Sequence, residues 1–253
     1  SWSPDGRYLV FSLADTRNQA GLHVLDTHTG GITPLPGSTL NDFTAEWSPA
    51  GDRIAFLSSR DGNFEIYLLD LPSGETRNLT NHTGDDRYPV WSPDGERIAF
   101  VASRDNRYDI YDLYVMDIES GRTRQVTETQ LIRSPPVWSP DGRLLAYRSE
   151  FTGSIEVVTR GGLPQFRIDD DHNYYQPEWS PDGTTLALYA DRNSRYTDIY
   201  LTSDEGASFA QITNGAGQLA RRMGLRRGLS DVPRAALRCG RARAEAGARR
   251  CAL

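Results

Sequence analysis

The stretch Trp91-Ser92-Pro93-Asp94-Gly95 decides the fold, because close copies of it return along the whole chain. The other copies begin at Trp2, Trp47, Trp138 and Trp179. Successive Trp residues are 45, 44, 47 and 41 positions apart. A period of about 40–50 residues is typical of propeller and solenoid arrays. The sequence therefore predicts a repeat protein.

Each residue type of this motif has a structural reason. Pro cannot donate a hydrogen bond to a sheet and so marks a strand end. Asp-Gly favours a tight turn, since Gly adopts positive φ without steric cost. We expect Trp47, Trp91, Trp138 and Trp179 to be largely buried at equivalent places between repeats. The turn residues of the motif are expected to be structural; they are Asp5, Asp94, Asp141, Asp182, Gly6, Gly51, Gly95, Gly142 and Gly183.

Further strands follow the motif at constant offsets. In the best-preserved repeat, the apolar run 98–100 begins seven residues after Trp91, and a third run lies at 113–116. A fourth short strand closes each unit, as at 77–80. Four antiparallel strands per repeat make a propeller blade. We predict an all-β propeller domain over residues 1–215, in which the first blade lacks most of its inner strand. The expected blades span about 1–40, 41–85, 86–132, 133–172 and 173–215.

The repeat resembles the TolB-like, WD40-like (PD40) β-propeller repeat family. The family pattern is Trp-Ser-Pro-Asp-Gly, Ile-Ala-Phe, Ser-x-Arg-Asp-Gly, Ile-Tyr and Leu-Thr, and residues 91–127 carry it nearly complete. The resemblance implies a six-bladed parent, so the five visible repeats are expected to form an incomplete ring. It also implies a periplasmic or extracellular protein that binds protein partners. No signal sequence is visible in the 253 residues.

Charge divides the chain into two parts. The whole chain holds 28 basic and 34 acidic residues, and residues 216–253 hold ten Arg and two acids, which leaves 18 basic and 32 acidic residues in 1–215, a net charge of −14. Nucleic acids require a basic face, so we expect no nucleic-acid partner. No apolar run reaches the roughly 18 residues of a membrane span. Both cysteines lie in the basic tail.

The Arg- and Ala-rich segment 216–253 breaks the strand pattern and has two interpretations. The first is a frameshifted sixth blade, which would be disordered or weakly helical. Met223-Gly224 read one nucleotide later encodes Trp, and Met223 lies 44 residues after Trp179, which is one repeat period. The second is a genuine basic tail that binds an acidic partner or a membrane.

Blade topology places the inter-blade connections, and the loops between second and third strands, on one face of the propeller. We call this the loop-bearing face, and we expect it to carry function, since loops on rigid scaffolds commonly do. The dense run 169–172 offers oxygen ligands that would suit a divalent cation, but we interpret it as a solvated loop and expect no cofactor and no metal. The candidate binding residues on this face are Asp42, Asp86, Arg87, Asp105, Asp169, Asp170, Asp171 and His172.

We assign no catalytic residue. The chain has no Gly-x-Ser-x-Gly nucleophile elbow and no phosphate-binding glycine loop. The leading hypothesis is a non-enzymatic scaffold that binds a protein or peptide through the acidic loop-bearing face. The alternative is the substrate-gating propeller of a prolyl-oligopeptidase-like serine peptidase whose catalytic domain is missing. A third hypothesis is a polysaccharide lyase with a metal in the propeller channel.

Overall fold

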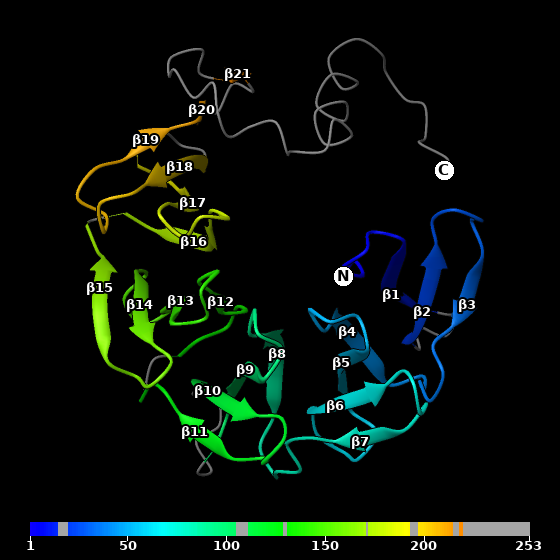
Figure 1. The fold of residues 1–253 in the computed structure, drawn as a ribbon. Helices are drawn as coiled ribbons and strands as arrows, with labels where there is room; N and C mark the ends of the chain where they lie inside the picture. The colour runs from blue at the N-terminus through cyan, green and yellow to red at the C-terminus, as the bar shows by residue number, and fades with distance from the viewer. Residues whose placement is uncertain are drawn as a thin grey trace.

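The computed structural model describes residues 1–14, 20–104, 111–128, 131–170, 172–192, 197–214 and 218–219. The regular elements among them are β-strands, arranged as sheets around a central axis (Figure 1). This confirms the predicted all-β propeller. None of the described residues belongs to a helix that is long and apolar enough to cross a membrane.

Five antiparallel sheets form the blades, and each runs outward from the centre in chain order. The first blade has three strands and the next four blades have four strands each. A further two-stranded hairpin follows them. The strands are β1 (Tyr8–Ala14), β2 (Ala20–Asp26), β3 (Ile32–Pro34); β4 (Asp42–Trp47), β5 (Arg53–Ser58), β6 (Glu65–Asp70), β7 (Thr76–Asn78); β8 (Asp86–Trp91), β9 (Arg97–Ala102), β10 (Asp112–Asp117), β11 (Thr123–Gln125); β12 (Val137–Trp138), β13 (Leu144–Arg148), β14 (Ile155–Thr159), β15 (Pro164–Ile168); β16 (Tyr174–Trp179), β17 (Leu186–Ala190), β18 (Asp198–Thr202), β19 (Ala210–Gln211); β20 (Thr213–Asn214) and β21 (Gln218–Leu219).

The Ser-Pro-Asp-Gly turn joins the inner strand of a blade to the second strand. In blade three the Ser92 hydroxyl donates to Asp94 Oδ1 at 2.5 Å, and the Arg97 amide donates back to Ser92 Oγ at 2.9 Å. Gly95 has φ of 71°, the left-handed conformation that favours glycine. These bonds hold β8 and β9 in register, with Trp91 opposite Ile98.

Blade two builds the same turn from different residues. Its motif has Ala50 where the other copies have Asp. The Ser48 hydroxyl donates instead to Asp52 Oδ1 at 2.9 Å, and the Arg53 amide donates to Ser48 Oγ at 3.0 Å. The carboxylate is therefore supplied from two positions further along the chain, and the turn geometry is kept.

The joints between blades two and three and between blades three and four share the same hydrogen bond. The Trp91 indole N–H donates to the Glu46 carbonyl of blade two at 3.2 Å, and Trp138 donates to the Val90 carbonyl of blade three at 3.2 Å. In blades two to five, the turn glycine also lies against the motif proline of the blade before it. A Cβ built on Gly142 would lie 3.6 Å from Pro93 Cδ.

Burial of the motif Trp residues differs from blade to blade. Trp91 and Trp138 are each 8% exposed, which confirms the prediction for these two. Trp47 and Trp179 are only partly buried, and their indole nitrogens have no partner among the described residues. In both cases the blade before them has little inner strand. Blade one contributes a single bridge between Trp2 and Leu9, and blade four contributes the two-residue β12.

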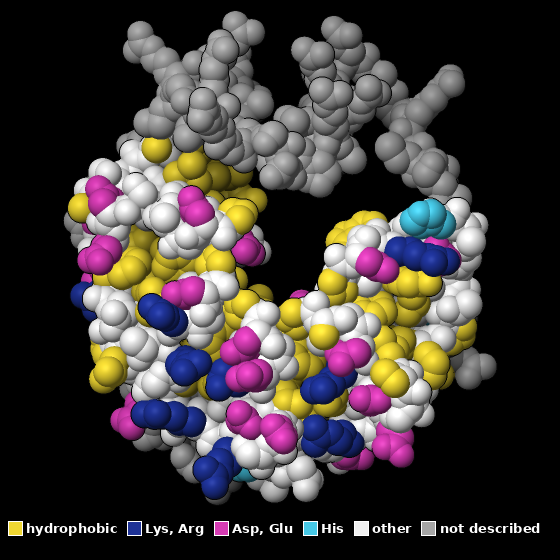
Figure 2. All heavy atoms as spheres, viewed as in Figure 1, with side chains coloured by type: hydrophobic (Ala, Val, Ile, Leu, Met, Phe, Trp, Pro, Cys, Tyr) yellow, Lys and Arg dark blue, Asp and Glu magenta, His cyan; other side chains and the backbone are white. Residues whose placement is uncertain are grey.

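The apolar core lies between successive blades, where one sheet packs face to face on the next. Figure 2 shows hydrophobic side chains following the ring, with charged side chains distributed around it. In the described part of the chain the ring is open between blade five and blade one (Figures 1 and 2). Trp2 at the open side is 57% exposed. The predicted tail, residues 216–253, lies outside the described residues apart from β21.

Candidate functional site

Strands β4, β8 and β16 begin at the loop-bearing face, and each carries an irregularity there. Their ladders shift register at a residue three positions before the motif Trp. The residue at that position has positive φ in all three strands: 35° at Thr44, 56° at Tyr88 and 45° at Gln176. Such a conformation is uncommon for residues other than glycine and costs about 1–3 kcal/mol. These bulges shape the inner rim of the loop-bearing face.

Asp42, the first predicted binding residue, lies fully buried at the start of β4. Arg60 donates to its Oδ2 at 2.8 Å, and the Thr39 amide and hydroxyl donate at 2.5 and 3.1 Å. The Arg60 guanidinium lies 4.5 Å from the centre of the Tyr67 ring. Asp42 thus ties the start of β4 to the loop after β5. Its carboxylate is enclosed by these partners and is not accessible to a ligand.

Asp86 occupies the equivalent place in blade three and is also fully buried. Arg104 donates to Oδ1 at 3.1 Å, but Oδ2 has no partner among the described residues. The nearby Thr80 hydroxyl donates to Glu65 instead. Burial raises the pKa of Asp86 to about 6, although the charge of Arg104 opposes the shift. A contribution of Asp86 to binding would therefore act through the position of Arg104.

Arg87, the next residue, lies at the surface of the same strand. It donates to Asp85 Oδ2 at 2.8 Å, and its guanidinium lies 4.2 Å from the centre of the Phe64 ring. Its Nε has no partner among the described residues. Arg87 is about one-third exposed and faces a small pocket with Tyr111.

The described residues of the 169–172 run, Asp169, Asp170 and His172, form ion pairs and hydrogen bonds with neighbouring side chains. Asp169 pairs with Arg167 at 2.5 Å. Asp170 accepts from Tyr174 at 2.5 Å and pairs with Arg192, and His172 lies 2.9 Å from it. Partial burial acts to raise the pKa of Asp170, but these hydrogen bonds outweigh it and lower the pKa.

Asp105 and Asp171 lie outside the described residues. Within the part of the chain that is described, no three His, Cys, Asp or Glu side chains are grouped so that they could hold a metal ion.

Two adjacent pockets lie on the loop-bearing face, and the sequence did not predict them. The first, of about 540 Å³, lies between blades four and five and is lined by Ser134, Arg148, Glu150, Tyr175, Gln176, Tyr189 and Thr197. The second, of about 240 Å³, lies beside blade three and is lined by Arg87, Tyr88, Tyr111, Ile132 and Arg133. Segment 131–136 separates them. The sequence carried a signal, because Arg133 stands five residues before Trp138, where blades two and three have Asp.

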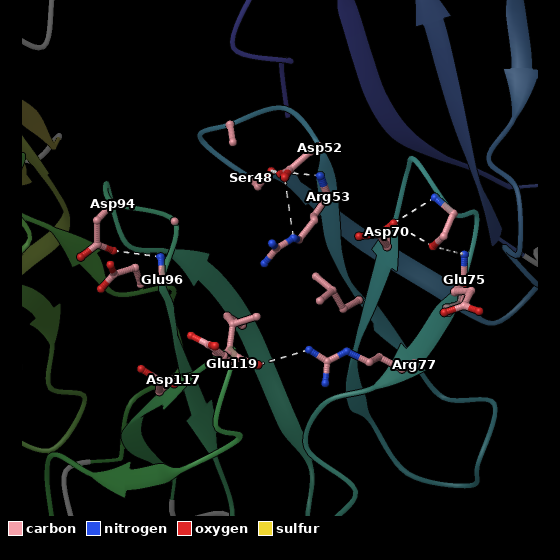
Figure 3. Close-up of a pocket in the computed structure, with 16 residues that line it drawn as sticks. Ser48, Asp52, Arg53, Asp70, Glu75, Arg77, Asp94, Glu96, Asp117 and Glu119 are labelled. Atoms are coloured by element: carbon pink, nitrogen blue, oxygen red, sulfur yellow. Dashed lines mark hydrogen bonds and ion pairs between the residues drawn. The ribbon is translucent and has the colours of Figure 1, made fainter.

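A larger groove, of about 1250 Å³, lies on the opposite face between the turns of blades two and three (Figure 3). Seven of its lining residues are acidic: Asp52, Asp70, Glu75, Asp94, Glu96, Asp117 and Glu119. Two are basic, Arg53 and Arg77. Several of these acids serve their own turns, since Ser73 donates to Asp70 and Ser120 donates to Asp117, each at 2.7 Å. Arg77 bridges the blades through the Ile118 carbonyl at 3.2 Å.

Radial four-stranded sheets, with the same joint repeated from blade to blade, define the molecule as a β-propeller domain. The chain belongs to the TolB beta propeller domain family (PD40), whose model matches residues 1–113 and 65–218.

Solved structures show the same fold. TolB from Acinetobacter baumannii matches with a TM-score of 0.66 and 21% identity over 82% of this chain. The chain spans about half of that protein, 53% of its length. A putative TolB from Agrobacterium tumefaciens matches with a TM-score of 0.63 and 26% identity, over 83% of this chain and 78% of its own. An oligogalacturonate lyase in complex with manganese matches with a TM-score of 0.69 and 18% identity, over 84% of this chain and 63% of its own.

Proposed function

We propose that this domain is a non-enzymatic scaffold that binds a protein partner through its loop-bearing face. One observation carries the proposal: the pockets of this face expose Tyr175 and Tyr189 beside the buried Arg148. Tyr and Arg are enriched among the residues that contribute most to binding at protein interfaces. Membership of the TolB propeller family supports the same function and favours a periplasmic or extracellular location.

The ion pairs of this face supply the rigidity that such a scaffold needs. Arg60, Arg104 and Arg192 each tie the end of one strand to the start of another. A rigid face loses little conformational entropy when a partner binds. We therefore expect substitutions that break these pairs to weaken binding, even where the substituted side chain is buried.

Affinity capture with the full chain tests the proposal. The immobilised wild-type chain should retain a protein partner. The Asp170→Asn and Asp86→Asn variants should each retain less of that partner. Asp141→Asn is the matched control, since Asp141 lies in a turn on the opposite face and accepts from Ser139 at 2.6 Å. Circular dichroism confirms that each variant is folded. No specific partner, or equal retention by all variants, would contradict the proposal.

The peptidase hypothesis has a separate test in the gene. A downstream segment that encodes Gly-x-Ser-x-Gly followed by Asp and His would favour a substrate-gating propeller. The similarity to the oligogalacturonate lyase shows the fold alone, and the lyase hypothesis stays a prediction.

A further inference from the structure

Blade four departs from the repeat at the rim of the loop-bearing face. Five residues before the motif Trp, the other complete blades place Asp42, Asp86 and Tyr174, all fully buried. Blade four places Arg133 there, and Arg133 is exposed. The cause is local: Pro135 and Pro136 cannot donate to a ladder, so β12 keeps only two residues. Segment 131–136 therefore lies outside the sheet, between the two pockets.

Three hydrogen-bond donors at these pockets lack an acceptor among the described residues. Arg133 makes no ion pair there. Arg87 Nε and Ser134 Oγ are shielded from solvent and have no partner. A buried polar atom without a partner costs about 1–3 kcal/mol, so such atoms call for an explanation. Of the three, Arg133 is the exposed one and can meet an incoming acceptor. A carboxylate is the strongest acceptor available in a protein.

The tyrosines supply the complementary apolar surface. Tyr175 is 36% exposed and Tyr189 is 41% exposed. Arg148, itself nine-tenths buried, lies 4.5 Å from the centre of the Tyr175 ring and pairs with Glu150. The pair fixes the ring without adding net charge to the pocket. An apolar or aromatic side chain would pack against the two tyrosines.

We propose that the two pockets receive one extended acidic peptide segment of the protein partner. An Asp or Glu carboxylate of this segment pairs with Arg133, and a neighbouring apolar side chain packs against Tyr175 and Tyr189. The inference rests on the proposed function and specifies the partner at the same face. Residues 1–215 carry a net charge of −14, so an acidic segment is repelled elsewhere on the propeller. Arg133 thereby fixes where the segment binds.

Fluorescence anisotropy with the full chain tests this inference. The probes are three fluorescein-labelled octapeptides that differ only at two central positions beside a phenylalanine: two glutamates, two glutamines or two arginines. The glutamate peptide should bind most tightly. Arg133→Gln should weaken it about tenfold, the effect expected for one charge-assisted hydrogen bond. Tyr175→Ala should weaken the glutamate and glutamine peptides alike.

Arg143→Gln is the matched control, because its side chain is 83% exposed on the opposite face. It should leave the affinity for the glutamate peptide unchanged. Equal binding of the three peptides, no effect of Arg133→Gln, or no binding of the glutamate peptide up to about 1 mM would overturn the inference. Tight binding of an acidic oligosaccharide in place of the peptide would also overturn it.

Affinity capture with the Arg133→Gln variant distinguishes the acidic peptide site from the scaffold function. A partner retained equally by wild type and Arg133→Gln leaves the scaffold function standing and refutes the acidic peptide site. A partner lost with Arg133→Gln, but not with Arg143→Gln, supports both proposals. Absence of any specific partner for wild type refutes the scaffold function, and the inference with it.

Discussion

At the scale of single residues, equivalent positions of the repeat contribute unequally to the free energy of unfolding. Trp91 is almost completely buried between blades two and three and donates a hydrogen bond across the joint. Trp2 has the same place in its motif but is mostly exposed. The same sequence position is therefore part of the core in one blade and part of the surface in another.

Replacement of Trp91 by Ala should lower the free energy of unfolding by about 3–5 kcal/mol, the usual cost of deleting a core Trp. Trp2→Ala is the matched control and should cost less than about 1 kcal/mol. Urea unfolding followed by circular dichroism measures both changes. A similar small cost for the two variants would contradict the role of Trp91 in the joint.

Asp86 should make stability depend on pH in a defined window. Its pKa is about 6 in the fold, above the ordinary 3.8, so the folded state binds a proton more tightly than the unfolded state. The contribution of Asp86 to the free energy of unfolding should therefore rise as pH falls from about 6 towards 4, and fall as pH rises through 6, by about 3 kcal/mol at most. Urea unfolding at pH 4.5 and 7.5 measures this dependence.

Asp86→Asn isolates the effect of that carboxyl. Burial also raises the pKa of Glu46 and Glu178, and these groups contribute equally to wild type and variant. The difference in pH dependence between the two proteins is therefore due to Asp86. Superimposable pH profiles would show that Asp86 is not the titrating group.

At the scale of elements, the turn between the inner and second strands is a self-contained unit. Its hydrogen bonds join residues no more than five positions apart, as between Ser92 and Arg97. Blade two keeps the turn with Asp52 in place of an Asp at position 50. The turn thus requires one carboxylate near the serine hydroxyl, and it accepts that carboxylate from either position.

A double substitution tests this exchange. Asp52→Ala should lower the free energy of unfolding by about 1 kcal/mol, since it removes the hydrogen bond to Ser48 and the ion pair with Arg53. Ala50→Asp combined with Asp52→Ala should restore most of the loss. A double-mutant cycle by urea unfolding measures the coupling between the two positions. If Ala50→Asp has the same effect with and without Asp52, the exchange is refuted.

The distance along the chain between interacting residues explains which features the sequence could predict and which it could not. The turns, strands and blade order follow from short-range signals, and the structure confirms the fold. Asp42 and Asp86 looked like free acids because their partners, Arg60 and Arg104, lie 18 positions further along the chain. The equal spacing in two repeats was a signal of an ion pair. The Arg133 pockets depend on packing between three blades, which no local pattern contains.

At the scale of the whole molecule, the described residues leave the ring open, and the open side exposes apolar surface of blade one. Val10 of β1 packs towards blade two, so Leu9, Phe11 and Leu13 alternate onto the other face. Leu13 is 48% exposed, and Trp2 is 57% exposed. An apolar surface of this kind favours association between molecules.

Self-association of the full chain should therefore increase with protein concentration. Leu13→Asp should shift the equilibrium towards monomer, since it places a charge on the exposed face. Leu163→Asp is the matched control, because Leu163 is 68% exposed in blade four, away from the open side. Sedimentation equilibrium measures both. A wild-type monomer at all concentrations would contradict the expectation.

The contact between the turn glycine of one blade and the proline of the blade before it has a consequence for how such chains change over generations. A Cβ on Gly51, Gly95, Gly142 or Gly183 would lie 3.3–3.7 Å from the preceding motif proline. Each blade thus presents the same half of the joint to whichever blade adjoins it. Unequal crossing-over between gene segments that encode two repeats would insert or delete a blade and still leave a matched seam. A chain with one blade more or one blade fewer would keep the same glycine–proline contact at each remaining joint.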